Sequence, residues 1–515
     1  MTALESLEPD IDPALAALAD AILIPPFFGT TPPPWLLRAL GRGLAGVTLF
    51  GSNMTGDTAA MTATLRSAAR HGAARHGAAR HGAAPAEPVI AIDEEGGDVT
   101  RVTYTSGSPY PGNAALGAVD DVALTGSVYA AIGTDLARLG INTDLAPCAD
   151  VLAADGSLVV GTRSFGSDPA LVARHVAAAV AGLQSAGLAA CAKHFPGHGS
   201  TAGDSHRELA TVAGTMRDLR VRDLPPFIAA VGASSLAMMP GHLRVPELTG
   251  ELPATLSPAA ITGLLRGELG FDGVVICDAL EMKAASAAFG IPEAAVLAVL
   301  AGTDLLCLGR DTDETMYHAV RSALADAVTS GRLAAGRLEE AAARVGGLRA
   351  RLAAGRSVSG IPADGAVGAG DGIGLVAARR ALRGAGPVPG PLADPLVVEV
   401  EPEENIAAGR FPWGFEPWAD VRRVDVAAGG GPAPAHTATA AGILADAAGR
   451  SLVLAVRDAR GVLPLISELF AARPDTVLVE MGVPAWAPPA GISYLATYGA
   501  SRACAQAAAE ALGLA

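Results

Sequence analysis

The sequence predicts an α/β fold in which buried parallel strands alternate with helices. Short apolar runs recur along the first two thirds of the chain, and stretches rich in alanine and leucine separate them. Continuous apolar runs of this kind are typical of strands covered on both faces. We expect such strands at residues 21–24, 46–50, 88–93, 142–146, 188–194, 236–239, 273–278 and 303–308. Eight alternating units fit a (β/α)8 barrel, although periodicity alone leaves a doubly wound sheet open.

Length and composition limit the classes of partner. The chain has 515 residues, of which 50% are hydrophobic and 17% charged, so it can build a large core and a second domain. A formal net charge of −15 argues against nucleic acid or an anionic membrane as partner. The sequence contains no run of eighteen apolar residues, so it predicts no membrane span. The acidic first residues do not resemble a signal peptide, and the five scattered cysteines are typical of buried thiols, so we expect a cytoplasmic protein.

Changes in composition suggest three parts. We expect a catalytic barrel at 1–356, a linker rich in Gly, Ala and Pro at 357–388, and a smaller α/β domain at 389–515 with strands at 396–400, 452–456, 476–480 and 492–495. The aromatic cluster at 411–418 fits core packing better than an exposed sugar platform. Because the last part shows no catalytic constellation, we expect a chain ending near Gly355 to retain activity.

The stretch 192–206 holds the densest group of chemically active side chains. The strand before it ends in Lys193 and His194, and a loop with prolines and glycines follows. The loop could be merely solvated, or His194, His198, Asp204 and His206 could bind a metal. That spacing matches no compact metal motif, and Lys193 would repel a cation, so we expect no metal and no cofactor. The third interpretation is an acid/base pair in which Asp204 orients and charges His206.

This stretch resembles the signature of a known family. Lys-His-Phe-Pro-Gly-His-Gly at 193–199, followed by Asp-Ser-His at 204–206, is similar to the β-N-acetylglucosaminidase branch of glycoside hydrolase family 3. The resemblance extends from about residue 15 to about residue 355 and implies a (β/α)8 barrel. It also implies that His206, with Asp204, replaces the carboxylic acid that most glycosidases use as general acid.

Two further segments carry the resemblance into a sugar site. Residues 93–101 resemble the family pattern Asp-x-Glu-Gly-Gly-x-Val-x-Arg, which implies that Asp93 and Arg101 bind the sugar. A solvated acidic turn is the alternative, and Glu94 and Glu95 are expected to be structural. Arg163, in an Arg-Ser-Phe-Gly element, is implied to contact the sugar too. A salt bridge from this arginine to an acidic strand end is the competing account.

The expected seventh strand ends at a candidate nucleophile. Asp278 follows five apolar residues, an unfavourable place for a charge unless function requires it. It could instead cap the next helix. The family keeps its nucleophile here in an Asp-x-Leu-x-Met context, which this sequence retains. Glu281 fits a capping box better than catalysis, and His242 resembles a family position near the sugar pocket.

Together with these residues, the resemblance implies a retaining exo-β-N-acetylglucosaminidase with the following mechanism. Asp278 attacks the anomeric carbon, His206 with Asp204 protonates the leaving oxygen, and Lys193 and His194 join the other sugar-binding residues. The expected partner is a small carbohydrate, from cell-wall recycling or chitin degradation. A phosphorylase, a β-glucosidase of the same family, and a catalytically inactive sugar-binding protein are the alternatives. The sequence leaves the natural substrate and the oligomeric state open.

Overall fold

The structure is a computed structural model that describes residues 11–75, 87–153, 160–201, 209–212, 214–359, 372–386, 392, 394–401, 409, 411–425, 439–484, 486, 488–489 and 491–515. It divides into two compact units. The first comprises 1–94, 125–153 and 167–367, and the second comprises 95–124, 154–166 and 368–515. Each unit has its own β-sheet.

The first unit is a (β/α)8 barrel, as the sequence predicts. Its strands are β1 (Leu23–Ile24), β2 (Gly46–Leu49), β3 (Val89–Ile92), β4 (Thr143–Asp144), β5 (Ala189–Phe195), β7 (Ala237–Pro240), β9 (Val274–Val275) and β10 (Leu306–Cys307). Six of them pair in parallel in the order β2-β3-β4-β5-β7-β9, and β1 pairs with β10. Each strand overlaps one of the apolar runs identified above and extends beyond it by at most one residue, so this part of the fold prediction is confirmed.

Backbone contacts close the strands into a ring. A parallel bridge between Ile276 and Leu305 connects the β9 side to β10, and Thr48 N donates to Pro25 O at 3.3 Å between β2 and the end of β1. Gly46 lets β2 approach β3, because a Cβ there would lie 1.8 Å from Val89 O. The carboxyl ends of all these strands therefore meet at one end of the barrel, where such folds place their sites.

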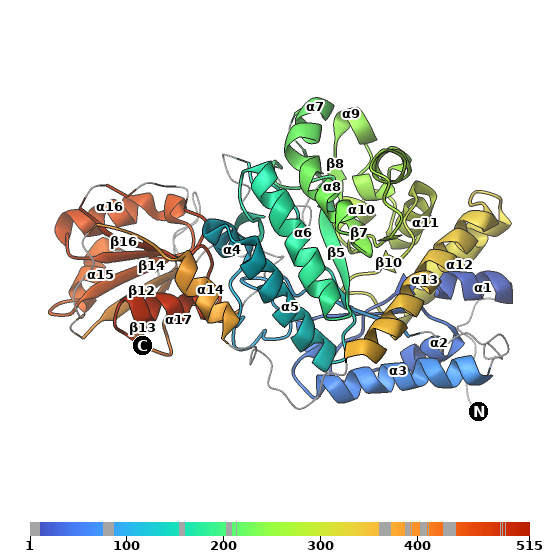
Figure 1. Cartoon of the computed structure of the whole chain (residues 1–515), viewed down its shortest axis with the longest axis horizontal. Coiled ribbons are helices and arrows are strands. Elements are labelled where there is room, and N and C mark those ends of the chain that lie inside the picture. Colours follow the sequence, from blue (N-terminus) through green and yellow to red (C-terminus); the bar gives the residue numbers. More distant parts are fainter. Residues whose placement is uncertain are drawn as a thin grey trace. The chain divides into compact units, whose positions relative to one another are not determined.

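Helices follow the strands and lie around the ring (Figure 1). They are α2 (Pro34–Arg42), α3 (Thr58–Arg75), α5 (Val122–Arg138), α6 (Pro169–Ser185), α8 (Leu224–Gly232), the π-helical η7 (Ala259–Glu268), α11 (Ile291–Ala301), α12 (Glu314–Thr329) and α13 (Ala335–Ser359). Helix α6 shows why these segments are helical. Asp168 caps its N-terminus by accepting from Ala170 N, Pro169 opens its first turn, and Val172, Val176 and Leu183 bury one face.

The structure bears on two expectations from composition, the state of the cysteines and the membrane-spanning character of the helices. All five cysteines are buried thiols, as their apolar surroundings in the sequence suggest. Among the described residues, no helix has both the length and the apolar character that crossing a membrane requires.

The second unit contains a six-stranded sheet in the order β11-β16-β15-β14-β12-β13, with β11 antiparallel to β16 and the other pairs parallel. The strands are β11 (Arg383–Ala385), β12 (Leu396–Glu401), β13 (Asp420–Asp425), β14 (Leu452–Val456), β15 (Val477–Glu480) and β16 (Ser493–Ala496). Helices cover both faces. Val397 of β12 packs in one core with Ala508 of α17 (Arg502–Ala511). The next residue, Val398, packs in another with Ile443 of α15 (Ala440–Asp446) and Ile466 of α16 (Leu463–Ala472).

The second unit differs from the sequence-based expectation in three ways. The range 357–388, expected to be a linker, contains α14 (Ile373–Ala381) and strand β11. Strand β13 was not anticipated, because four of its six residues are charged. In addition, segments 95–124 and 154–166, expected to belong to the barrel, group with the C-terminal residues. The aromatic cluster does pack into the core, since Phe411, Trp413 and Phe415 are buried.

Candidate active site

Strand β5 brings a buried lysine to the carboxyl end of the barrel. The Lys193 side chain is 3% exposed, and its Nζ lies 2.5 Å from Oδ1 of Asp93, which follows β3 and is 22% exposed. A buried ammonium without a counter-charge would destabilise the fold by about 3–5 kcal/mol, so each group fixes the other. The sequence predicted both residues as sugar-binding, and the structure brings them together at the end where a substrate would bind.

Several ionisable groups converge around one thiol of the same strand. Burial raises the pKa of Cys191 above its ordinary value, the Lys193 ammonium lowers it, and the carboxylates of Asp93, Asp144 and Asp278 raise it further. These four ionisable side chains lie near the carboxyl ends of β3, β4, β5 and β9, and all act electrostatically on one buried residue. The end of β5 is therefore the centre of the candidate site.

Asp278 has the exposure that a nucleophile needs. It lies three residues beyond β9, is partly exposed, and accepts a hydrogen bond from Ala279 N at 2.7 Å. The next loop is held in place by His242, a buried side chain whose Nε2 lies 3.0 Å from Ala279 O. His242 was expected near the sugar pocket. In the structure its Nε2 contacts the backbone beside Asp278.

Glu281 does not cap a helix as expected. Its carboxylate accepts the backbone N–H groups of Arg310 and Asp311, both at 2.5 Å, in the loop after β10. The short helix α10 (Lys283–Ser286) begins after Met282, which makes no side-chain cap. Glu281 therefore fixes one loop of the carboxyl end against another.

No role was predicted for Asp144, the last residue of β4. It is completely buried, and Oδ1 accepts from Glu94 N at 3.0 Å, while Oδ2 has no hydrogen-bond partner among the described residues. Burial, and then the neighbouring carboxylates of Glu94 and Asp93, raise the pKa of Asp144 well above its ordinary value, against the Lys193 ammonium. An aspartate at the end of an apolar strand is the signal that could have identified it.

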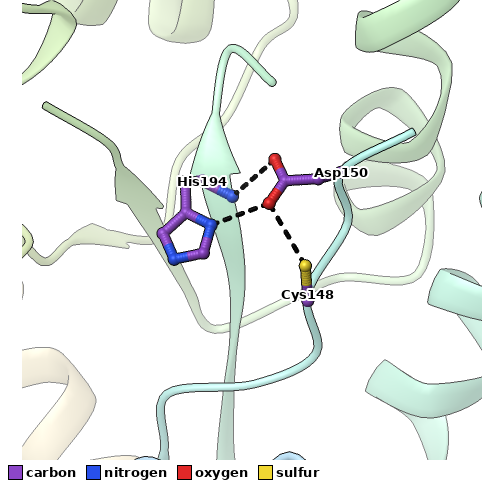
Figure 2. Close-up of side chains that lie close together, drawn as sticks. All are labelled: Cys148, Asp150 and His194. Atoms are coloured by element: carbon purple, nitrogen blue, oxygen red, sulfur yellow. Dashed lines mark hydrogen bonds and ion pairs between the residues drawn. The ribbon is translucent and has the colours of Figure 1, made fainter. Parts of the chain in front are cut away.

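Asp150 orients His194, as Figure 2 shows. Its Oδ2 lies 2.8 Å from His194 Nδ1, and its Oδ1 accepts the backbone N–H groups of His194 at 3.2 Å and His198 at 2.7 Å. Burial raises the pKa of Asp150, but the His194 imidazole and the contacts with His198 outweigh it, giving a pKa of about 2. A carboxylate accepts only, so His194 carries its proton on Nδ1.

The same cluster contains three atoms of metal-ligand type. Cys148 Sγ, Asp150 Oδ2 and His194 Nδ1 lie within 4.8 Å of one another and are buried (Figure 2). Cys148 Sγ lies 3.1 Å from Asp150 Oδ2, and Oδ2 lies 2.8 Å from Nδ1. Tetrahedral zinc would hold such atoms about 3.3–3.7 Å apart. The observed spacing is that of direct hydrogen bonds, which satisfy Asp150 without an ion.

The loop after β5 is fixed as far as the structure describes it. Thr201 Oγ1 lies 2.6 Å from His198 Nδ1, and Ala153 N donates to Gly199 O at 3.0 Å. A Cβ on Gly199 would lie 1.7 Å from Val151 O, so this contact requires glycine. The predicted acid pair, Asp204 and His206, lies outside the described residues, and its role stays a prediction.

In the second unit, Arg163 forms a buried ion pair with Glu95. The pair is bidentate, with Nε to Oε2 at 2.9 Å and Nη2 to Oε1 at 2.7 Å. The sequence left a salt bridge open for Arg163 but did not identify its partner. Arg101 lies in the same unit and is partly exposed.

Comparison with known proteins gives the family and a close structural relative. The family model described as "Glycosyl hydrolase family 3 N terminal domain" matches residues 40–348. The structure is similar to that of a glycoside hydrolase family 3 β-N-acetylglucosaminidase from Paenibacillus sp. str. FPU-7, with a TM-score of 0.82 and 30% identity, covering 97% of this chain and 96% of that one.

Other relatives match part of the chain. β-Hexosaminidase A of Pseudoalteromonas piscicida is 33% identical over 346 residues, which is 63% of this chain and 56% of the relative. β-Hexosaminidase LpqI of Mycobacterium tuberculosis is 38% identical over 266 residues, 51% of this chain and 68% of the relative. The match thus spans little more than half the length of the Pseudoalteromonas protein.

Proposed function

The chain belongs to glycosyl hydrolase family 3, and we propose that it is a retaining exo-β-N-acetylglucosaminidase. The observation that carries the proposal is the placement of Asp278, a partly exposed carboxylate at the end of β9 that shares the electrostatic surroundings of Cys191 with Asp93 and Lys193. The similarity to a β-N-acetylglucosaminidase over 97% of the chain supports this choice of substrate class.

In the proposed mechanism Asp278 attacks the anomeric carbon through an oxocarbenium-like transition state and forms a glycosyl-enzyme intermediate. His206, oriented and charged by Asp204, protonates the leaving oxygen and then deprotonates the incoming water. Asp93, Lys193 and the Nε2 side of His194 bind hydroxyl groups of the sugar.

Arg101 and Arg163 complete the proposed set of sugar-binding residues. In this proposal Glu95 fixes the orientation of the Arg163 guanidinium through its bidentate pair.

The test is an assay with nitrophenyl N-acetyl-β-glucosaminide and the matching glucoside, with and without phosphate. We expect turnover of the N-acetyl substrate, independent of phosphate, with the β-anomer of N-acetylglucosamine released first in the NMR spectrum. A sugar phosphate as product would instead assign a phosphorylase, preference for the glucoside a β-glucosidase, and binding without turnover an inactive sugar-binding protein. Chito-oligosaccharides and cell-wall fragments, compared in the same way, would identify the natural substrate.

A further inference from the structure

The segment that carries Arg101 is built into the C-terminal unit. Ala503 N, at the start of α17, donates to Ser108 O at 3.3 Å, and Arg380 of α14 pairs with Asp121 at 2.9 Å. Val99 is buried in the core cluster of the C-terminal sheet. Residues 95–124 therefore take their position from residues that come more than 250 positions later.

Asp98 is the charged centre of this connection. Its side chain is 5% exposed, and Oδ2 accepts from Arg457 Nη2 and from Thr162 Oγ1, both at 2.9 Å. Its other oxygen, Oδ1, accepts from Ala500 N at 2.9 Å. One buried carboxylate thus connects the turn before Arg101, the residue before Arg163, and two parts of the C-terminal unit.

The turn itself is tightly constrained. Gly96 and Gly97 have φ values of 73° and 63°, a conformation that L side chains rarely adopt. Gly97 N donates to Tyr110 O at 3.1 Å, and Glu95 N donates to Val99 O, also at 3.1 Å. Because the turn is closed by these bonds, a displacement of Asp98 would move the whole of 95–101.

Arg457 is held in place from its other side. It follows β14, and its guanidinium carbon lies 4.8 Å from the ring centre of Phe411 and 5.9 Å from that of Trp413. Two aromatic rings and a buried carboxylate leave this arginine few conformations. It is 17% exposed, so water screens its ion pair with Asp98 only weakly.

We propose that Arg457 of the C-terminal unit is a positioning residue for sugar binding. Through Asp98 it holds the turn that carries Arg101 and, through Thr162, the segment that carries Arg163. The inference rests on the proposed function, which assigns both arginines to the sugar. It changes one expectation from the sequence: a chain ending near Gly355 would leave the Asp98 carboxylate without Arg457 and Ala500, so we now expect weakened sugar binding.

The test compares three substitutions in the full chain. Arg457→Met keeps a side chain that packs on Phe411 and Trp413 but removes the charge, and Arg457→Lys restores the charge. Arg460→Met is the matched control, because Arg460 pairs with Asp458 at 3.1 Å in a more exposed place. We expect Arg457→Met to raise KM for nitrophenyl N-acetyl-β-glucosaminide about tenfold with kcat changed by less than about threefold. Arg457→Lys should largely restore KM, and Arg460→Met should leave it unchanged.

Hydrogen exchange gives a second readout that does not depend on activity. In Arg457→Met, amides of residues 95–103 should exchange faster, while those of β5 should not. Unchanged KM with unchanged exchange at 95–103 would overturn the inference, and so would equal acceleration in β5, which would indicate general destabilisation. If Arg457→Met does not fold, the double variant Asp98→Asn/Arg457→Met, which leaves no buried charge, should show the same rise in KM. An inactive wild type would refute the proposed function, while exchange would still decide whether Arg457 holds the turn.

Discussion

Carboxylates at the two ends of the barrel differ in their hydrogen bonds and ion pairs. At the amino end of β10, Asp304 is completely buried and paired with Arg266 at 2.5 Å, Arg337 at 2.8 Å and Arg344 at 3.5 Å. Val275 N also donates to it at 3.0 Å. Every oxygen of this aspartate is used within the protein, so nothing is left for a ligand.

The carboxyl end holds several carboxylates whose hydrogen bonding differs from one to the next. Asp93 is paired with Lys193, Asp144 has one oxygen without a partner among the described residues, and Asp278 is partly exposed. This contrast indicates that the number of hydrogen bonds and ion pairs to a carboxylate at a strand end distinguishes a structural role from a chemical one. A saturated carboxylate stabilises the barrel, while an unsaturated one is available for chemistry.

The largest expected effect comes from Asp278→Ala. Loss of the nucleophile should lower kcat by about 10⁴-fold or more, and the fold should survive because an uncharged strand end is easier to bury. Asp272→Asn, at an exposed position just before β9, is the control. Mass spectrometry after a slow fluorosugar substrate should place the label on Asp278. A label on Asp93, Asp144 or Asp304 would contradict the assignment.

The next effect concerns the predicted acid. His206→Ala should slow a poorly activated glycoside by about 10²–10⁴-fold but a dinitrophenyl glycoside far less, because a good leaving group needs no proton. Asp204→Asn should reproduce part of the loss, and wild-type activity should fall on the alkaline side as the imidazole loses its proton. Equal slowing of both substrates would make His206 a binding residue and direct the search to His198 and Glu208.

At the opposite end, Asp304→Asn should affect stability and spare catalysis. Three arginines would face an amide in place of a carboxylate, which should lower the free energy of unfolding by about 3–5 kcal/mol. Urea unfolding would measure this, and kcat of the folded variant at 25 °C should stay within about twofold of wild type. A large loss of kcat in the folded variant would break the division of roles between the two ends.

The smallest effects are changes in the pH dependence of stability, which we expect at two aspartates of the carboxyl end. The pKa of Asp150 is about 2 in the folded chain, below its value of about 3.9 when unfolded. Asp150 therefore stabilises the fold above about pH 4, and this stabilisation, about 2–3 kcal/mol, is lost as the pH falls towards 2. Asp150→Asn should remove it, so that the difference from wild type in urea unfolding shrinks between pH 5 and pH 3.

Asp144 should show the opposite sign. Because its folded pKa is raised, its contribution is present at low pH and is lost as the pH rises through that value. Asp144→Asn, which keeps the acceptor for Glu94 N, should be at least as stable as wild type at pH 8. A loss of thermal stability at pH 8 would show that Asp144 is ionised and paired.

Local composition is sufficient to locate the barrel strands and the ends at which Asp93, Lys193 and Asp278 lie. A strand covered on both faces must be apolar throughout, so local composition shows where it begins and ends. The first polar residue after it marks its carboxyl end. Strand β13 was not predicted, because most of its residues are charged and only its pairing with β12 makes it a strand.

Which charged side chains pair with one another depends on the tertiary fold. Asp93 and Lys193 are 100 positions apart, and Asp98 and Arg457 are 359 positions apart. No role was predicted for Asp150, and its four donors are apparent only in the structure, where β4 and β5 lie side by side. An ion pair depends on where two backbones pass each other, and no local pattern encodes that distance. Which residues are buried is therefore readable from the chain, while the partner of each buried charge is fixed by the fold.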